Sequence, residues 1–222
     1  EQVFKNSLTT LAMGGGKDSL VLWDVLMEMG YETEGLYIDL GIEGYSDRSR
    51  EKVIDYAREK GKRPIIVELA KEGIPIPEAA RCIRMQECAI CGTVKRYFFN
   101  RVAAEGKFNV VATGHNLDDE VATLFGNVMR WQTGYLVRQD PTLPADGEGL
   151  ARKIKPLCRI YERETAAYAI LQGIDYIEEE CPYAKGATSL QYKETLTQME
   201  HDVPGTKLQF YVKFLQAKAE GL

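Results

Sequence analysis

Short apolar segments alternate with longer amphipathic segments along this chain. The apolar segments are rich in aliphatic residues and have the length of buried strands. This pattern predicts strands at Leu8–Met13, Glu34–Leu40, Pro64–Leu69, Phe108–Thr113 and Arg152–Pro156, and a further strand at Tyr176–Glu178.

The segments between the strands repeat apolar residues at helical spacing. The first carries Leu20, Trp23 and Leu26, and Gly30 follows it as a typical C-terminal cap. The spacing predicts helices at Asp18–Met29, Ser46–Lys60, Cys91–Glu105, Asp118–Trp131, Glu162–Leu171, Ser189–His201 and Thr206–Lys218. Prolines in Gly73–Gln86 favour a loop or a short helix, and the polar, proline-containing stretch Gln132–Gly149 predicts a mobile loop.

Strands that alternate with helices predict an α/β fold with a doubly wound, mostly parallel sheet of five to six strands, Rossmann-like in arrangement. We expect a catalytic domain at residues 1–186 and a C-terminal helical extension at residues 187–222. In sheets of this kind ligands bind beyond the carboxyl ends of the strands. Two loops therefore gain interest, the one after the first strand and the one after the fourth.

The composition fits a soluble enzyme better than a membrane protein or a general nucleic-acid binder. The 222 residues are 45% hydrophobic and 27% charged. No apolar run approaches the ~20 residues that cross a bilayer, and the first residues lack a signal-peptide pattern, so we expect a cytoplasmic location and no membrane partner. The net charge of −5 means that contact with RNA would need a local basic patch or a further segment.

The first motif is the glycine-rich turn after the first strand. Glycines allow a close backbone approach to a phosphate, and the following helix offers free N–H groups to it. The spacing differs from that of a Walker A loop, and a plain strand-to-helix turn is the alternative. The candidate nucleotide-binding residues here are Met13, Gly14, Gly15, Gly16, Lys17, Asp18 and Ser19.

The second motif is a pair of cysteines, Cys88 and Cys91, at the spacing of two ligands of one metal centre. Cys181 is the best candidate for a third ligand, whereas Cys82 and Cys158 lie in less distinctive surroundings. Three cysteines without an obvious fourth ligand suit an iron–sulfur cluster with one open iron. A zinc staple and a redox dithiol are the competing interpretations.

The third motif, GHNLDDE, follows the fourth strand. Gly114 and His115 lie at the strand end, and the carboxylates of Asp118 and Asp119 could hold Mg²⁺ that bridges phosphates. Simple capping of a helix is the alternative for the acidic residues, and a structural role is equally open for His115.

These motifs together resemble a known family. GGGKDS is similar to the SGGxDS signature of PP-loop ATPases, with Gly14 in place of the usual Ser. CxxCGxxKR, ATGHNLDDE and ECPYAKGA resemble, in the same order, the tRNA 2-thiolation enzymes of the TtcA/TtuA type. The resemblance covers most of the chain. The CxxC zinc modules that flank the catalytic domain in TtuA-type enzymes do not occur in this sequence, so we expect them to lie outside it or to be absent.

The resemblance implies an ATP-dependent tRNA sulfurtransferase that adenylates the C2 oxygen of a pyrimidine and replaces it with sulfur. It implies ATP, Mg²⁺ and a [4Fe-4S] cluster held by Cys88, Cys91 and Cys181. Asp119 is the implied acid or base, and Lys95 its partner at the substrate or phosphate. The implied partners are tRNA, a sulfur donor (a carrier protein or inorganic sulfide) and a second copy of the chain.

Two alternatives stay open from the sequence. One is a PP-loop ligase or sulfurtransferase that acts on a small molecule or a carrier protein. The other is a binding module that senses nucleotide and cluster without turnover. A local strip that binds phosphates, drawn from basic residues, would favour RNA; its candidates are Arg96, Arg130, Arg138, Arg152 and Lys155.

Overall fold

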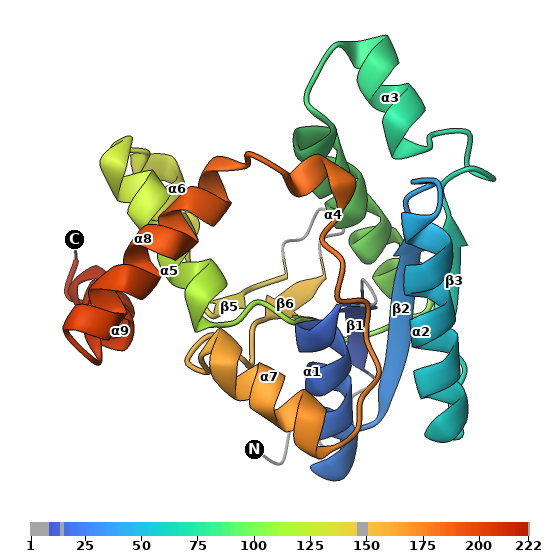
Figure 1. The fold of residues 1–222 in the computed structure, drawn as a ribbon, viewed down its shortest axis with the longest axis horizontal. Coiled ribbons are helices and arrows are strands. Elements are labelled where there is room, and N and C mark those ends of the chain that lie inside the picture. Colours follow the sequence, from blue (N-terminus) through green and yellow to red (C-terminus); the bar gives the residue numbers. More distant parts are fainter. Residues whose placement is uncertain (1–8, 14–15, 146–150, 222) are drawn as a thin grey trace.

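A computed structural model describes residues 9–13, 16–145 and 151–221 (Figure 1). The parallel strands are β1 (Thr9–Met13), β2 (Thr33–Asp39), β3 (Ile65–Glu68), β4 (Val110–Thr113) and β6 (Arg152–Ile154), and β5 (Thr142–Leu143) pairs antiparallel with β6. The helices are α1 (Lys17–Glu28), α2 (Tyr45–Glu59), α3 (Ile76–Ile83), α4 (Glu87–Glu105), α5 (Leu117–Met129), α6 (Thr133–Arg138), α7 (Glu162–Leu171), α8 (Thr188–Asp202) and α9 (Thr206–Ala219), with a 3₁₀ turn, η1, at Pro182–Ala184.

The strand order is β3-β2-β1-β4-β6-β5 in the part of the chain that the structure describes. The chain moves outward from β1 through β2 to β3, and then returns to place β4 on the other side of β1. The order therefore reverses between β1 and β4. At such a point the loops beyond the carboxyl ends of both strands diverge and leave a crevice between them.

Helices cover both faces of the sheet, and β2 shows this by its alternation. Leu36 and Ile38 belong to the buried cluster that includes α3 and α4. Tyr37 points the other way, into the cluster built from α1, α2 and the end of α7. The α/β class with a parallel sheet is thus confirmed.

Two sequence predictions were wrong in detail. The expected mobile loop at Gln132–Gly149 contains α6 and β5, because Leu136 is buried against α5 and the Gln139 amide donates to the Glu120 carbonyl oxygen (2.8 Å). The expected strand at Tyr176–Glu178 is irregular: its central residue Ile177 and the nearby Ile174 are buried, but the segment pairs with no described strand. Gly73–Gln86 does form a short helix, α3.

The last two helices pack on α5 beside the sheet, where Figure 1 shows α5, α6, α8 and α9 grouped near β5 and β6. Leu196 of α8 and Tyr211 of α9 share a buried cluster with Leu117 and Leu124 of α5. The C-terminal helices therefore belong to the same hydrophobic core as a helix that begins at the sheet. The boundary at residue 187 stays a prediction.

A buried ion pair reinforces this packing. The Lys207 Nζ lies 2.5 Å from Asp118 Oδ1, and the two side chains are 4% and 9% exposed. Asp118 also accepts a hydrogen bond from the backbone N–H of Glu162 (2.7 Å). Burial opposes ionisation of this carboxyl, but the Lys207 ammonium and the Glu162 N–H outweigh it and hold the pKa of Asp118 below its ordinary value.

We predict that Lys207→Met lowers the free energy of unfolding by about 3–5 kcal/mol, because it leaves the Asp118 charge buried without its partner. Urea unfolding at neutral pH measures the loss. The stabilisation from Asp118 is complete above the ordinary carboxyl pKa of about 4 and disappears as the pH falls through the lower, folded-state pKa. The difference between variant and wild type should therefore shrink in strong acid.

The matched control is Lys52→Met. Lys52 lies on α2, and the substitution removes its exposed ion pair with Asp175. Its unfolding midpoint should stay close to that of the wild type, since water replaces an exposed partner. Equal losses in the two variants would show that burial of the Asp118 pair contributes nothing.

Candidate functional site

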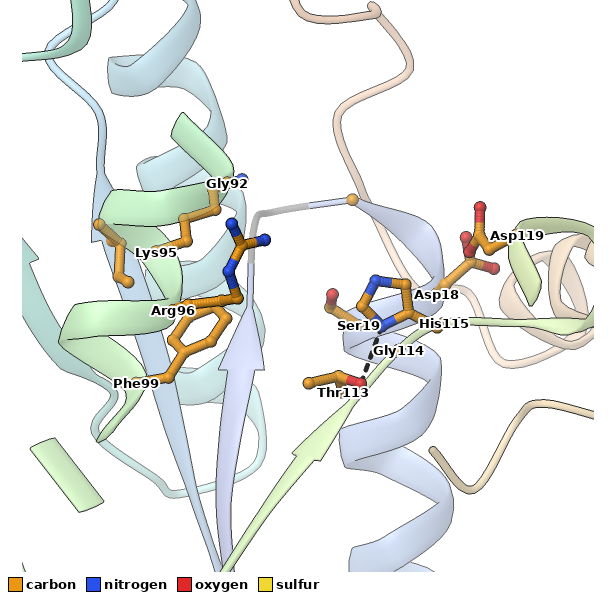
Figure 2. Close-up of a pocket in the computed structure, with 12 residues that line it drawn as sticks. Asp18, Ser19, Gly92, Lys95, Arg96, Phe99, Thr113, Gly114, His115 and Asp119 are labelled. Atoms are coloured by element: carbon orange, nitrogen blue, oxygen red, sulfur yellow. Dashed lines mark hydrogen bonds between the residues drawn. The ribbon is translucent and has the colours of Figure 1, made fainter. Parts of the chain in front are cut away.

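A cavity of about 400 Å³ opens at the carboxyl ends of β1 and β4, where the strand order reverses. Figure 2 shows Lys95, Arg96 and Phe99 of α4 on one side and Ser19, His115 and Asp119 on the other. The lining residues are Gly16, Asp18, Ser19, Ile38, Gly92, Lys95, Arg96, Phe99, Thr113, Gly114, His115 and Asp119. The two loops chosen from the sequence thus meet at one site.

The start of α1 forms one wall of the cavity. Gly16 is the N-cap residue in an extended conformation, and it has no side chain to accept a hydrogen bond from the first helical N–H groups. Open N–H groups at a helix start, with the positive end of the helix dipole, favour a bound anion such as phosphate. Gly14 and Gly15 lie outside the described residues, and Met13 ends β1 directly before them.

Gly114 brings the other loop against this helix start. A Cβ atom at Gly114 would lie 3.0 Å from both the Asp18 carbonyl carbon and the Ser19 nitrogen. These are backbone atoms that cannot move away cheaply. The lack of a side chain at Gly114 therefore lets the ends of β1 and β4 approach each other and sets the width of the cavity.

Lys17 turns away from the cavity. Its Nζ lies 2.9 Å from Asp18 Oδ1 and 3.4 Å from Glu162 Oε1. Thr165 of α7 also donates a hydrogen bond to Asp18. Asp18 and Ser19 line the cavity, whereas Lys17 connects the turn to α7 and does not line it. The expected role of Lys17 in phosphate binding stays a prediction.

The three consecutive acids of the GHNLDDE motif have three different surroundings. Asp118 pairs with Lys207 and lines a different pocket. Glu120 is 3% exposed and pairs with Lys155 at 2.8 Å. Of these three acids, only Asp119 lines the cavity at the ends of β1 and β4. The contacts of Asp118 do not favour its expected role as a Mg²⁺ ligand, which stays a prediction.

Asp119 also caps α5. Its Oδ2 accepts from the Asn116 N–H (3.2 Å), and its own N–H donates to Asn116 Oδ1 (3.0 Å). The simple capping expected as an alternative is therefore present, together with exposure to the cavity. Among the buried side-chain nitrogen and oxygen atoms of the described ranges, only the Asn116 Nδ2 lacks a hydrogen-bond partner.

The contacts of His115 fit both roles considered for it, a structural role and a role in ligand binding. Its Nδ1 is 2.8 Å from Thr113 Oγ1, and the ring lines the cavity (Figure 2). Thr113 thereby fixes the orientation of a ring that still faces the ligand space.

The three candidate metal ligands gather where η1 meets the start of α4. Cys88 and Cys91 lie in the first two turns of α4, and the Cys88 thiol donates to the Tyr183 carbonyl oxygen (3.0 Å) just after Cys181. Cys91 and Cys181 pack in one cluster with Tyr45. The described residues include no group of three ligands close enough for a single metal ion. The iron–sulfur cluster and the zinc staple considered from the sequence both stay predictions.

The thiols influence one another. Burial raises the pKa of Cys88, and the neighbouring Cys181 and Cys91 raise it further. Burial also raises the pKa of Cys91, while the nearby Lys95 ammonium opposes the rise. The Cys88 and Cys91 thiols, which resist ionisation, become thiolates most readily when a metal centre binds them, since binding couples to proton release.

Lys95 connects the thiol site to the cavity. It lies one helical turn after Cys91, whose pKa its ammonium lowers, and it lines the cavity, as does Gly92, the residue after Cys91. The beginning of α4 thus carries two of the thiols, and the turns that follow line the cavity. The cavity and the three cysteines therefore lie next to each other, and their roles as nucleotide cradle and cluster ligands stay predictions.

Sequence reasoning missed Phe99, which lines the cavity, although its signal was present. Gly92, Lys95 and Phe99 lie three to four residues apart and so share a helix face. The two preceding aromatic residues of α4 do not line the cavity, because Phe98 is buried in the core and Tyr97 is exposed. Of the proposed basic strip, Arg96 lines the cavity, whereas Arg152 and Lys155 line another pocket.

Residues 1–186 match a family model described as a PP-loop domain. This chain belongs to the PP-loop domain family. The match covers both loops of the cavity and the three cysteines. A PP-loop domain implies the binding of ATP.

Two relatives of this PP-loop domain carry the name tRNA-5-methyluridine(54) 2-sulfurtransferase. The protein from Thermus thermophilus is 51% identical over 207 residues, 93% of this chain and 64% of that relative. The protein from Thermotoga maritima is 42% identical over 218 residues, 97% of this chain and 72% of that relative. The chain therefore spans about two thirds of the length of these relatives.

A solved structure is also similar to this PP-loop domain. The U34-tRNA thiolase NcsA from Methanococcus maripaludis, described with its [4Fe-4S] cluster, superimposes with a TM-score of 0.86 at 25% identity. The superposition covers 100% of this chain and 75% of that one.

We predict that Gly114→Ala weakens ATP binding by at least about tenfold, a cost of ~1.4 kcal/mol, because the added methyl group meets backbone at Asp18 and Ser19. Isothermal titration with a non-hydrolysable ATP analogue measures the affinity. Gly134→Ala is the control, since a Cβ atom there meets nothing within 4 Å. An affinity unchanged by Gly114→Ala would show that ATP binds away from this crevice.

Proposed function

We propose that this chain is the catalytic part of an ATP-dependent tRNA 2-thiolation enzyme. The observation that carries the proposal is the position of Lys95, which lies one helical turn after Cys91 on α4 and lines the cavity between the two PP-loop motifs. An activated oxygen in the cavity and a sulfur at the thiols would then be neighbours. The names of the relatives support tRNA as the substrate.

In the first step, the C2 oxygen of a pyrimidine attacks the α-phosphorus of ATP and pyrophosphate leaves. The open start of α1 receives the phosphates. Asp18 and Asp119 are the cavity carboxylates that would hold Mg²⁺, which would offset the charge of the phosphates. Arg96 adds a fixed cation at the opposite wall. The carbonyl oxygen, a poor leaving group, becomes part of an adenylate.

In the second step, a sulfur nucleophile attacks the C2 carbon, the C–O bond breaks, and AMP leaves with the original oxygen. Asp119 takes the proton released when the carbon–sulfur bond becomes a thiocarbonyl, because its carboxylate faces the cavity. The Lys95 ammonium stabilises the negative charge on the departing phosphate. The nucleophile enters as sulfide or an equivalent anion, so no oxidant or reductant is needed.

Cys88, Cys91 and Cys181 would hold the [4Fe-4S] cluster. They fit it as a set, since three mutually interacting thiols come from two segments with a cation beside them. When bound, a cluster with three protein ligands supplies one iron open to an external sulfur. The sulfur donor, a homodimer and a cytoplasmic location are further predictions of this proposal. No described helix has the length and apolarity to cross a membrane.

We predict that Cys181→Ser removes the brown colour and the iron content of protein purified without oxygen, because the third thiolate is lost. Iron analysis and visible absorbance measure the loss. Cys82→Ser is the matched control and should retain both, since Cys82 lies exposed on α3 and is not part of the set. Full iron content in Cys181→Ser would exclude Cys181 as a ligand.

The activity itself is tested with a tRNA transcript, ATP and sodium sulfide under anaerobic conditions, followed by nucleoside mass spectrometry. We expect a thionucleoside and one pyrophosphate per product. Asp119→Asn should keep ATP binding and retain only a small residual rate of product formation, because the amide cannot accept the proton. A wild-type enzyme that releases pyrophosphate only with a small molecule or a carrier protein would contradict tRNA as the substrate.

A further inference from the structure

Lys193 approaches the candidate catalytic acid from the C-terminal helices. It lies on α8, and its Nζ is 2.6 Å from Asp119 Oδ1 and 3.2 Å from Glu162 Oε2. The lysine side chain is 23% exposed, so the ammonium sits between the two carboxylates rather than in free solvent. Neither the GHNLDDE motif nor the cysteine motif contains this residue.

The contacts of Asp119 divide between its two oxygens. Oδ2 accepts the hydrogen bond from the Asn116 backbone at the start of α5. Oδ1 contacts Lys193. The Asn116 N–H and the Lys193 ammonium, which come from different parts of the chain, thus determine the plane of the Asp119 carboxylate. Without Lys193, only the capping contact at one oxygen would remain among the contacts that the structure describes.

Lys193 is a persistent cation. Burial favours its neutral form, but the Asp119 and Glu162 carboxylates outweigh burial and raise the pKa of Lys193 above its ordinary value. The Lys193 side chain therefore keeps its positive charge at neutral pH.

We propose that Lys193 is the positioning residue for Asp119. Its ammonium fixes the rotation of the carboxylate so that one oxygen is aimed at the cavity for proton transfer. The inference rests on the proposed function, because it assigns to Asp119 the proton-transfer role in thiolation. A misaligned base loses rate rather than affinity, since alignment matters mainly in the transition state.

Glu162 offers the competing explanation. Its Oε2 contacts Lys193 while its Oε1 lies 3.4 Å from Lys17, so Lys193 could act by ordering α7 and the turn before α1. In that case the loss of Lys193 would disturb the phosphate end of the site. ATP affinity would then fall together with turnover.

The experiment compares Lys193→Met with Lys193→Arg and Lys52→Met in the full-length, cluster-loaded enzyme. We expect Lys193→Met to lower kcat for thiolation by at least about tenfold, with the Kd for an ATP analogue within about threefold of wild type. Lys193→Arg should restore most of the rate, since it keeps the cation. Lys52→Met should keep the wild-type kcat, because Lys52 lies on α2, pairs with Asp175 and does not line the cavity.

A double-mutant cycle identifies the residue through which Lys193 acts. On an Asp119→Asn background, Lys193→Met should lower kcat by no more than about twofold, whereas on a Glu162→Gln background it should keep its full effect. A full additional loss on the Asp119→Asn background would overturn the inference, as would a loss of ATP affinity in Lys193→Met. If the wild type forms no thionucleoside, the proposed function fails; if it does and Lys193→Met is normal, only this inference fails.

Discussion

The close approach of two backbone segments, Gly114 after β4 and Asp18–Ser19 at the start of α1, determines the rest of the site. The reversal of strand order between β1 and β4 creates a crevice, but its width depends on how near the two loops come. A side chain at Gly114 would separate them. Because it has none, the helix start, His115 and Asp119 all face one cavity of about 400 Å³. The third wall, α4, then adds its cations from the opposite side.

Helical geometry distributes three consecutive carboxylates to three functions. Successive residues of an α-helix point about 100° apart, so neighbours in sequence face different surroundings. Asp118 turns to Lys207 and stabilises the packing of α9, Glu120 turns to Lys155 and the sheet, and Asp119 turns to the cavity. Two of the acids thus anchor the helix from which the third acts. A buried pair broken on one side would shift α5, and with it the candidate base.

The sequence predicted the parts of this arrangement that local pattern determines. Apolar strands, capped helices and the order of the motifs were sufficient for the α/β class and for the meeting of the β1 and β4 loops. The irregular path of Tyr176–Glu178 and the helix inside Gln132–Gly149 were not predictable in this way, since each depends on burial against distant elements. The contact of Lys193 with the site was not predictable for the same reason. Its partners Asp119 and Glu162 lie far away in sequence, and a lysine in an amphipathic helix normally indicates a solvated face.

The net charge of −5 does not by itself argue against an RNA substrate, because the charges next to the site matter more than the total. Asp24, Asp118 and Glu120 are buried and each pairs with a lysine, so these pairs are neutral and leave the net charge unchanged. Two cations, Lys95 and Arg96, line the cavity itself. Arg130 and Arg138 are exposed on the helices beside the sheet. Since screening confines surface electrostatics to roughly 8–10 Å, the charges next to the site decide which substrate approaches, and total charge does not.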